Sequence, residues 1–179
     1  MEWKTRRSEV VFDGKRVKVR RDVLLSPEGR EVVREVVSLA KAATAAAALT
    51  LKDDGRVVLV RQYRHPAGRE LLEIPAGVVE PGETPEDCIA RELVEETGYE
   101  AADIRPLLEF YPSPGIVSER IHVFIARALT HRGDAQEEDE GITVVETEFE
   151  EALRMVRYGE ITDAKTIIAL LAARRFGLA

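Results

Sequence analysis

An acidic segment, residues 77–99, holds the residues of this chain whose types and spacing best suit chemistry. Its sequence, GVVEPGETPEDCIARELVEETGY, contains seven acidic residues and one base, Arg91. Glu92 and Glu96 stand four residues apart, so on a helix they face the same way, with Glu95 beside them. Carboxylate oxygens without His or Cys suit Mg²⁺ or Mn²⁺ rather than Zn²⁺. The segment therefore predicts a hard-cation site, and a merely solvated helix face is the alternative.

The residues around these carboxylates predict a helix with defined ends over residues 85–97. Thr84 can cap its N-terminus, Pro85 suits the first helical position, and Gly98 suits a left-handed stop. A capped helix that follows a glycine-bearing loop presents its carboxylates at fixed offsets. This arrangement favours the cation site over an incidental acidic surface.

The other elements must position this helix, and their order predicts an α+β fold. Strands are expected first, over residues 9–37 with turns and again over 119–129, and two amphipathic helices over 149–156 and 164–171. Strands first, one helix in the middle and two at the end do not make a βαβ repeat.

Residues 39–50, LAKAATAAAALT, give conflicting signals. Alanine favours helix, but the segment runs into the turn signal Asp53-Asp54-Gly55, and the apolar run VVLVRQYR follows. We therefore predict a strand over residues 43–51.

Composition excludes some partners. A net charge of −7 argues against nucleic acid, because a phosphate backbone requires a basic face. No apolar run is long enough for a membrane span, and a charged start predicts neither signal peptide nor anchor. The single cysteine, Cys88, excludes an intrachain disulfide and favours a cytoplasmic location. The lack of Asn, with only two Gln, suggests a thermophilic source.

The acidic segment resembles the Nudix box, G-x5-E-x7-R-E-U-x-E-E-x-G-U, where U is a bulky apolar residue. All nine specified positions match: Gly77, Glu83, Arg91, Glu92, Leu93, Glu95, Glu96, Gly98 and Tyr99. The tyrosine is a slightly polar choice for the last apolar position. The chain thus resembles Nudix hydrolases, which cut the pyrophosphate of a nucleoside diphosphate linked to another group.

The resemblance implies an α/β/α sandwich, with a mixed sheet between helices and an N-terminal antiparallel strand region. It implies a single Nudix domain over residues 1–179, with its core at 40–179. The strand region, residues 1–38, is expected to form a homodimer whose partner subunit helps hold the adenine.

The resemblance also assigns roles within the box. Glu92 and Glu96 match the main metal ligands, Glu95 shares that work, and Ala76 matches a position whose carbonyl joins the coordination. The expected cofactor is Mg²⁺, with Mn²⁺ possible, and two or more ions can neutralise the diphosphate and activate water.

Three further residues of the box match positions that support the metal ligands. Arg91 and Glu83 match residues that orient the loop through a salt bridge. Gly77 matches a position where backbone geometry requires glycine.

Features outside the box resemble ADP-ribose pyrophosphatases, which release AMP and ribose 5-phosphate. They are the segments LLEIPAG (71–77), YPSPGIVSER (111–120) and VRQYRHP (60–66). Pro114 lies 15 residues after Tyr99, the proline placement of this subfamily. Arg64 matches an arginine that reaches the substrate phosphates, although a surface salt bridge is the alternative. Glu119 is a candidate contact to metal or ribose.

Members of this subfamily take a general base from a loop after the sheet. The matching stretch here is QEEDEGITVV, residues 136–145. Aligned on its apolar run, Glu138 falls at the base and Glu140 at an additional metal ligand. A shift of one or two residues would exchange these roles, and a solvated acidic loop is the alternative.

Three other functions compete with ADP-ribose hydrolysis. A Nudix enzyme could act on another nucleotide sugar, NADH or a nucleoside triphosphate. A sensing module would bind ADP-ribose without cleaving it, but such modules usually lose box carboxylates. An interaction domain with an incidental acidic helix would show no metal dependence.

Overall fold

The computed structural model describes residues 2–39, 44–133 and 141–179. Its contacts divide the chain into two compact units. One comprises Met1–Ala43 and Tyr111–Arg120, and the other comprises Thr44–Phe110 and Ile121–Ala179. Residues 111–120 therefore belong with the N-terminal strands, although they follow the acidic segment in the chain.

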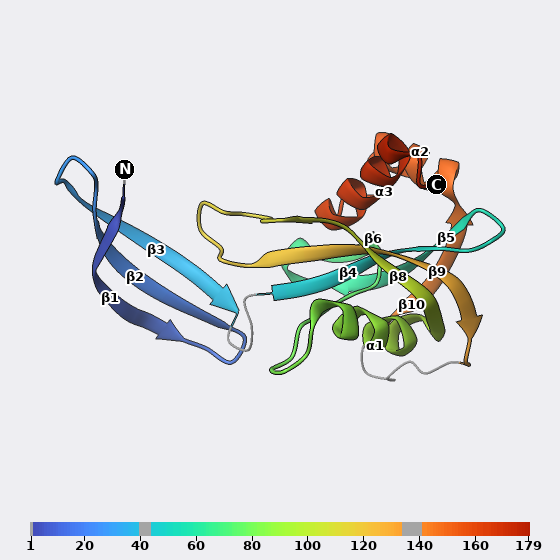
Figure 1. Ribbon diagram of the computed structural model, residues 1–179, viewed down its shortest axis with the longest axis horizontal. Helices are drawn as coiled ribbons and strands as arrows, with labels where there is room; N and C mark the ends of the chain where they lie inside the picture. The colour runs from blue at the N-terminus through green and yellow to red at the C-terminus, as the bar shows by residue number, and fades with distance from the viewer. Residues whose placement is uncertain (1, 40–43, 134–140) are drawn as a thin grey trace. The chain divides into compact units, whose positions relative to one another are not determined.

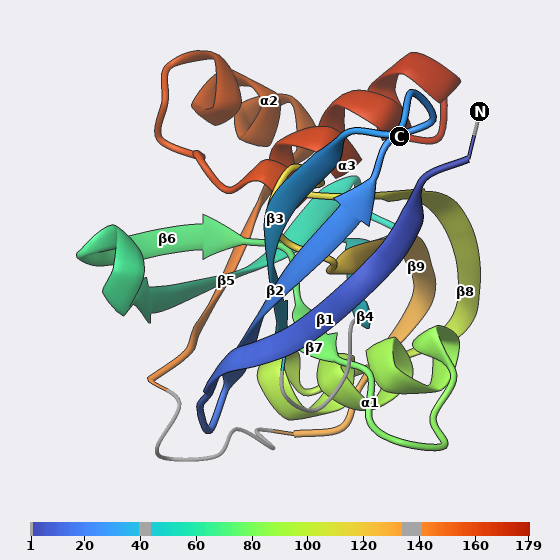
Figure 2. The ribbon, with the colours of Figure 1, turned by 90° about the vertical axis from the view of Figure 1, so that its left-hand side faces the viewer.

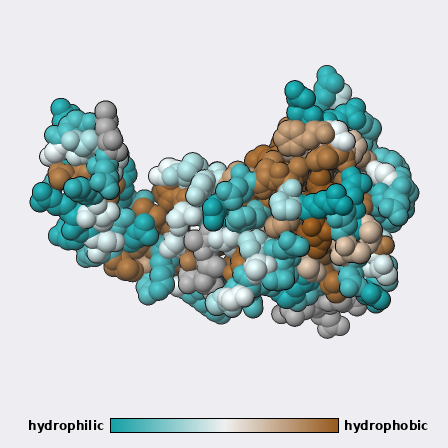
Figure 3. Space-filling model, viewed as in Figure 1, coloured by the Kyte–Doolittle hydropathy of each residue, from teal (hydrophilic) through white to brown (hydrophobic). Residues whose placement is uncertain are grey.

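The first unit is built on a three-stranded antiparallel sheet of β1 (Lys4–Asp13), β2 (Val17–Leu25) and β3 (Glu31–Leu39). The predicted strands and turns are confirmed. Segment 111–120 pairs with the other edge of β3, where the Val37 amide donates to the Ile116 carbonyl at 2.8 Å. All of β1 is exposed, and Figure 3 shows hydrophobic side chains among hydrophilic ones on this unit.

The second unit is a mixed seven-stranded sheet of order β10-β5-β4-β9-β8, with β6 beside β5 and β7 beside β4. Its strands are β4 (Thr44–Leu51), β5 (Arg56–Arg64), β6 (Arg69–Glu73), β7 (Ala76–Val78), β8 (Tyr99–Phe110), β9 (Arg120–His131) and β10 (Thr143–Glu148). A short 3₁₀ turn, His65–Ala67, joins β5 to β6. Helix α1 (Pro85–Thr97) covers one face, while α2 (Phe149–Arg157) and α3 (Ala164–Phe176) cover the other (Figures 1 and 2). The predicted sandwich is confirmed.

Strand β4 lies at the centre of this sandwich and explains the alanine-rich sequence. Successive strand residues point to opposite faces. Ala46 and Ala48 pack in the cluster of α1, whereas Ala47 and Leu49 pack in the cluster of α2 and α3, and all four are fully buried. Burial on both faces outweighs the helix propensity of alanine, so the predicted strand is confirmed over its described residues.

Helix α1 has the predicted ends. Thr84 accepts a hydrogen bond from the Asp87 amide, the Asp87 side chain bonds back to the Thr84 amide, and Pro85 opens the helix. Gly98 ends it with a φ of 71°. A Cβ at Gly98 would lie 2.3 Å from the Gly133 carbonyl oxygen, so close approach adds to the need for glycine.

The two C-terminal helices follow their predicted apolar patterns. Asp163 caps α3, because its carboxylate accepts a hydrogen bond from the Thr166 amide at 3.0 Å. Among the described helices, none combines the length and apolar character that crossing a membrane requires.

Candidate active site

The carboxylates of α1 lie against the backbone of β7. The Glu96 side chain is buried, and its Oε2 accepts a hydrogen bond from the Ala76 amide at 3.0 Å. One residue further along β7, an added Cβ on Gly77 would fall 1.8 Å from Oε1 of Glu92. Because only a residue without Cβ allows this approach, Gly77 brings the Glu92 carboxylate to the strand. The structure thus brings together Ala76, Gly77, Glu92 and Glu96.

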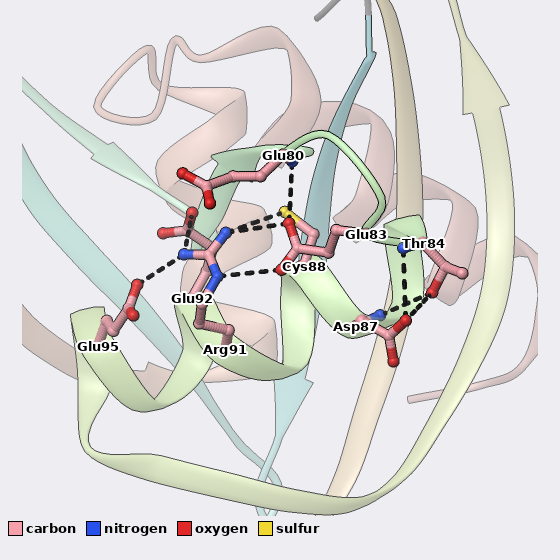
Figure 4. A network of polar contacts seen from close by, with 8 residues as sticks. All are labelled: Glu80, Glu83, Thr84, Asp87, Cys88, Arg91, Glu92 and Glu95. Atoms are coloured by element: carbon pink, nitrogen blue, oxygen red, sulfur yellow. Dashed lines mark hydrogen bonds and ion pairs between the residues drawn. The ribbon is translucent and has the colours of Figure 1, made fainter. Parts of the chain in front are cut away.

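Arg91 is the centre of a second set of contacts on the same helix (Figure 4). Its Nε and Nη2 donate to the two oxygens of Glu83 at 3.0 and 3.2 Å. Its Nη1 donates to Glu92 at 2.9 Å and to Glu95 at 2.7 Å. One guanidinium therefore compensates part of the charge of three carboxylates and ties the loop before α1 to the helix. The ion pair expected between Glu83 and Arg91 is present.

These contacts keep the participating groups charged. Hydrogen bonds with Glu83, followed by those with Glu92, raise the pKa of Arg91. Hydrogen bonds from Arg91 and from the Glu80 amide lower the pKa of Glu83. Glu83 is therefore ionised at neutral pH, as a fixed partner of Arg91 must be.

Cys88 sits beside this network but belongs to the core. It is fully buried in the cluster that joins α1 to β4. Burial, together with the charges of Glu83 and Glu92, raises the pKa of its thiol to about 12. The thiol is therefore protonated at neutral pH and is not a nucleophile.

The donor set fits a divalent ion in its chemistry. Glu92, Glu95 and Glu96 offer carboxylate oxygens, and Ala76 offers a carbonyl oxygen, which are ligands that Mg²⁺ and Mn²⁺ accept. Within the described residues, no three acidic, His or Cys side chains are already arranged to hold an ion. The cation among these carboxylates is instead the Arg91 guanidinium, which binds Glu92 and Glu95.

Arg64 lies at the end of β5 and forms an ion pair with Glu73 of β6. Its Nε and Nη2 donate to the two carboxylate oxygens at 2.7 and 2.8 Å. The Glu73 side chain is 2% exposed and also contacts Lys165 of α3. Glu73 and Lys165 were not among the residues selected from the sequence. A charged residue inside the apolar run LLEIPAG was the available signal for Glu73.

The last position of the box resemblance, Tyr99, has a polar role that its sequence position does not reveal. Its hydroxyl lies 2.6 Å from Glu146 of β10, and the Lys52 ammonium lies 2.6 Å from the same carboxylate. The Tyr99 side chain therefore links β8, the strand after α1, to β10.

The remaining candidates are not among the described residues of the second unit. Pro114 and Glu119 are in segment 111–120, which belongs to the unit of the N-terminal sheet. Glu138 and Glu140 lie outside the described residues.

The NUDIX domain family model matches residues 41–171 of the chain. The ADP-ribose pyrophosphatase of Bacillus subtilis (strain 168) is 40% identical over 95% of this chain and 91% of its own. The methanol dehydrogenase activator of Bacillus methanolicus is 37% identical over 94% of this chain and 91% of its own. A GDP-mannose pyrophosphatase of Escherichia coli O1:K1 / APEC is 46% identical over 64% of each chain.

A solved structure, described as an ADP compounds hydrolase, has the same fold. It superposes with a TM-score of 0.87 over 98% of this chain and 94% of its own, at 21% identity. The family match covers most of the second unit, and the 40% identical relative extends over nearly the whole chain. The chain therefore belongs to the NUDIX family and is a Nudix hydrolase.

Proposed function

We propose that the chain hydrolyses the pyrophosphate bond of ADP-ribose, or of a similar nucleoside diphosphate sugar, to release AMP and ribose 5-phosphate. The observation that carries this proposal is the placement of Glu92 and Glu96 on the Ala76–Gly77 backbone. It gathers two carboxylates at one place against the strand, as binding a cation beside a diphosphate requires. The relatives named for ADP-ribose and for GDP-mannose support a nucleotide sugar as the substrate.

Nudix hydrolases use divalent metal ions, and we propose Mg²⁺, with Mn²⁺ as a substitute and two or more ions in total. Glu92 and Glu96 would be the main ligands, with Glu95 and the Ala76 carbonyl beside them. When bound, the metal supplies neutralisation of the diphosphate charge and activation of water. Arg91 and Glu83 hold the loop before α1, which keeps the ligands in register with β7.

We propose Glu138 as the general base and Glu140 as an additional metal ligand. In hydrolysis a water oxygen forms a bond to phosphorus, while the bond from phosphorus to the bridging oxygen breaks. The bridging oxygen keeps the electron pair and leaves on the second phosphate. The water proton passes to the Glu138 carboxylate, which need only come within hydrogen-bonding distance in the reacting state.

We propose that Arg64 contacts the substrate phosphates, that Pro114 contributes to substrate binding, and that Glu119 contacts metal or ribose. Two observations support this role for Arg64. Its side chain is partly exposed, so a substrate can reach it, and the ion pair with Glu73 already fixes its guanidinium. Pro114 and Glu119 rest on the resemblance of segment 111–120 to ADP-ribose pyrophosphatases.

Two other activities are tested alongside this one. A Nudix hydrolase of NADH, another nucleotide sugar or a nucleoside triphosphate would share the metal site. A non-catalytic ADP-ribose sensor is less favoured, because Arg91, Glu92, Glu95 and Glu96 are all retained.

We further propose one Nudix domain whose N-terminal strands form a homodimer in the cytoplasm of a heat-adapted organism. Val10, Val11, Phe12 and Val33 are large hydrophobic residues exposed on the N-terminal sheet, which suits burial against a second copy. The buried free thiol of Cys88 suits a reducing compartment.

The first test of the function is turnover of a substrate panel with Mg²⁺, Mn²⁺ or EDTA. The panel contains ADP-ribose, GDP-mannose, NADH, diadenosine polyphosphates and nucleoside triphosphates, and products are identified by mass spectrometry. We expect metal-dependent release of AMP and ribose 5-phosphate, with ADP-ribose the best substrate. If another nucleotide were the best substrate, the proposal of ADP-ribose would be wrong. If turnover continued in EDTA, the proposed metal dependence would be wrong. ADP-ribose binding without turnover would favour the sensor.

Replacing metal-ligand carboxylates should remove activity without unfolding the chain. Glu92→Gln and Glu96→Gln keep the side-chain shape but lose the charge, so we expect kcat to fall by about 100-fold or more. Glu86→Gln, on the exposed first turn of the same helix, is the control and should change kcat less than about twofold. Equal effects of all three variants would argue against a localised metal site.

Glu138→Gln should lower kcat by about 100-fold or more, as loss of a general base does, with little change in metal affinity. Glu140→Gln should instead weaken metal binding, measured as the Mn²⁺ concentration at half-maximal activity. Full activity in both variants would place the base elsewhere.

Light scattering should give twice the 20.0 kDa mass of the chain. Phe12→Asp puts a charge on the exposed sheet face and should shift the mass toward one chain. A wild-type mass of one chain at micromolar concentration would contradict the homodimer.

A further inference from the structure

A buried ionic network connects β5 and β6 to the start of α3. Glu73 accepts two hydrogen bonds from Arg64 and forms an ion pair with Lys165. Lys165 also lies 3.1 Å from Asp163, which caps α3. The side chains of Glu73 and Lys165 are 2% and 10% exposed, whereas that of Arg64 is 40% exposed. The network thus runs from the interior to one partly exposed guanidinium.

Local preferences disfavour this arrangement. Lys165 is the second residue of α3, where the positive end of the helix dipole disfavours a cation. Desolvating charged groups costs several kcal/mol per ion, and a buried ion pair is often no more stable than an apolar replacement. Stability alone therefore gives little reason for Lys165 at this position.

The network fixes the orientation of the Arg64 guanidinium. Two parallel hydrogen bonds from Nε and Nη2 fix the plane of the guanidinium, while Nη1 takes no part in the pair with Glu73. These bonds raise the pKa of Arg64, and the charges of Glu96 and Asp163 raise it further. Glu73, the partner of Arg64, lies three residues before Ala76, whose amide donates to the box carboxylate Glu96, so one short stretch of chain connects Arg64 to the proposed metal site.

Lys165 reduces the extent to which the Glu73 carboxylate neutralises the charge of Arg64. Burial raises the pKa of Glu73, but the hydrogen bonds and charges of Arg64 and Lys165 hold it below its usual value. Glu73 is therefore ionised, and two cations share its charge. The ammonium of Lys165 offsets part of the carboxylate charge, so Arg64 is held in place without being fully neutralised.

We propose that Glu73 and Lys165 are positioning residues that hold the Arg64 guanidinium, rigid and still cationic, for the diphosphate of the substrate. The inference rests on the proposed function, in which Arg64 contacts the phosphates. Neither residue touches the substrate, so both act only through Arg64.

A double-mutant cycle tests this dependence. Arg64→Ala should raise the KM for ADP-ribose by about tenfold or more, since it removes a charge-assisted contact. Lys165→Met, which keeps the buried stem without the charge, should raise KM by about threefold to tenfold. In the Arg64→Ala background Lys165→Met should have less than about a twofold further effect, because its target is gone. Lys165→Arg should restore most of the affinity.

The matched control is Lys52→Met. Lys52 is also a largely buried lysine in an ion pair, but its partner is Glu146, in a network that does not include Arg64. Its removal should lower the melting temperature and leave KM within about twofold in both backgrounds. If Lys165→Met does not fold, Lys165→Gln takes its place in the cycle.

The same cycle is measured by calorimetry as the Kd of ADP-ribose in EDTA, which separates the inference from the proposed function. Additive effects of Arg64→Ala and Lys165→Met on KM or Kd would overturn the inference, as would an unchanged KM in Arg64→Ala. A wild type that binds ADP-ribose but does not cleave it would overturn the function, while a non-additive Kd cycle would still support the inference. A wild type that neither binds nor cleaves ADP-ribose would overturn both.

Discussion

The main constraint on this structure is that two carboxylates of α1, Glu92 and Glu96, lie on one face of the helix and against the backbone of β7. Glu92 and Glu96 point the same way from α1, and Glu96 is buried. Repulsion and desolvation both oppose this arrangement. The Ala76 amide offsets part of the cost at Glu96, and the Arg91 guanidinium offsets part at Glu92. Much of the local architecture serves these two contacts.

The surrounding elements set the distance between helix and strand. The small residues Ala46 and Ala48 of β4 let the cluster of α1 pack closely on the sheet. The missing side chain of Gly77 lets β7 approach Glu92. A capping box at Thr84 and a left-handed stop at Gly98 fix the length of the helix. Packing and backbone geometry therefore place the carboxylates.

A second charged network joins β5 and β6 to the start of α3. Glu73 lies at the end of β6, three residues before β7 begins, and it receives Arg64 from β5 and Lys165 from α3. The segment between Glu73 and Gly77 thus links a buried ion network to the carboxylates of α1. The proposed phosphate-binding arginine and the proposed metal ligands are consequently held by one short stretch of chain.

Sequence patterns predicted the elements whose structure is determined by residues close to them in the chain. The helix at 85–97 followed from Thr84, Pro85 and Gly98, and the alanine strand followed from the turn after it. Short strands such as β7, and pairings such as that of segment 111–120 with β3, depend on contacts between distant residues and were not predicted. Glu73 and Lys165 were missed for the same reason, because their partners lie far apart in the chain.

Anomalous diffraction from crystals grown with Mn²⁺ tests the central claim most directly, because it locates the ion without relying on turnover. We expect an anomalous peak in contact with the carboxylates of Glu92 and Glu96. This expectation would be contradicted by Mn²⁺ peaks that all lie away from α1, or by a chain that binds no Mn²⁺ in these crystals while it hydrolyses ADP-ribose in solution.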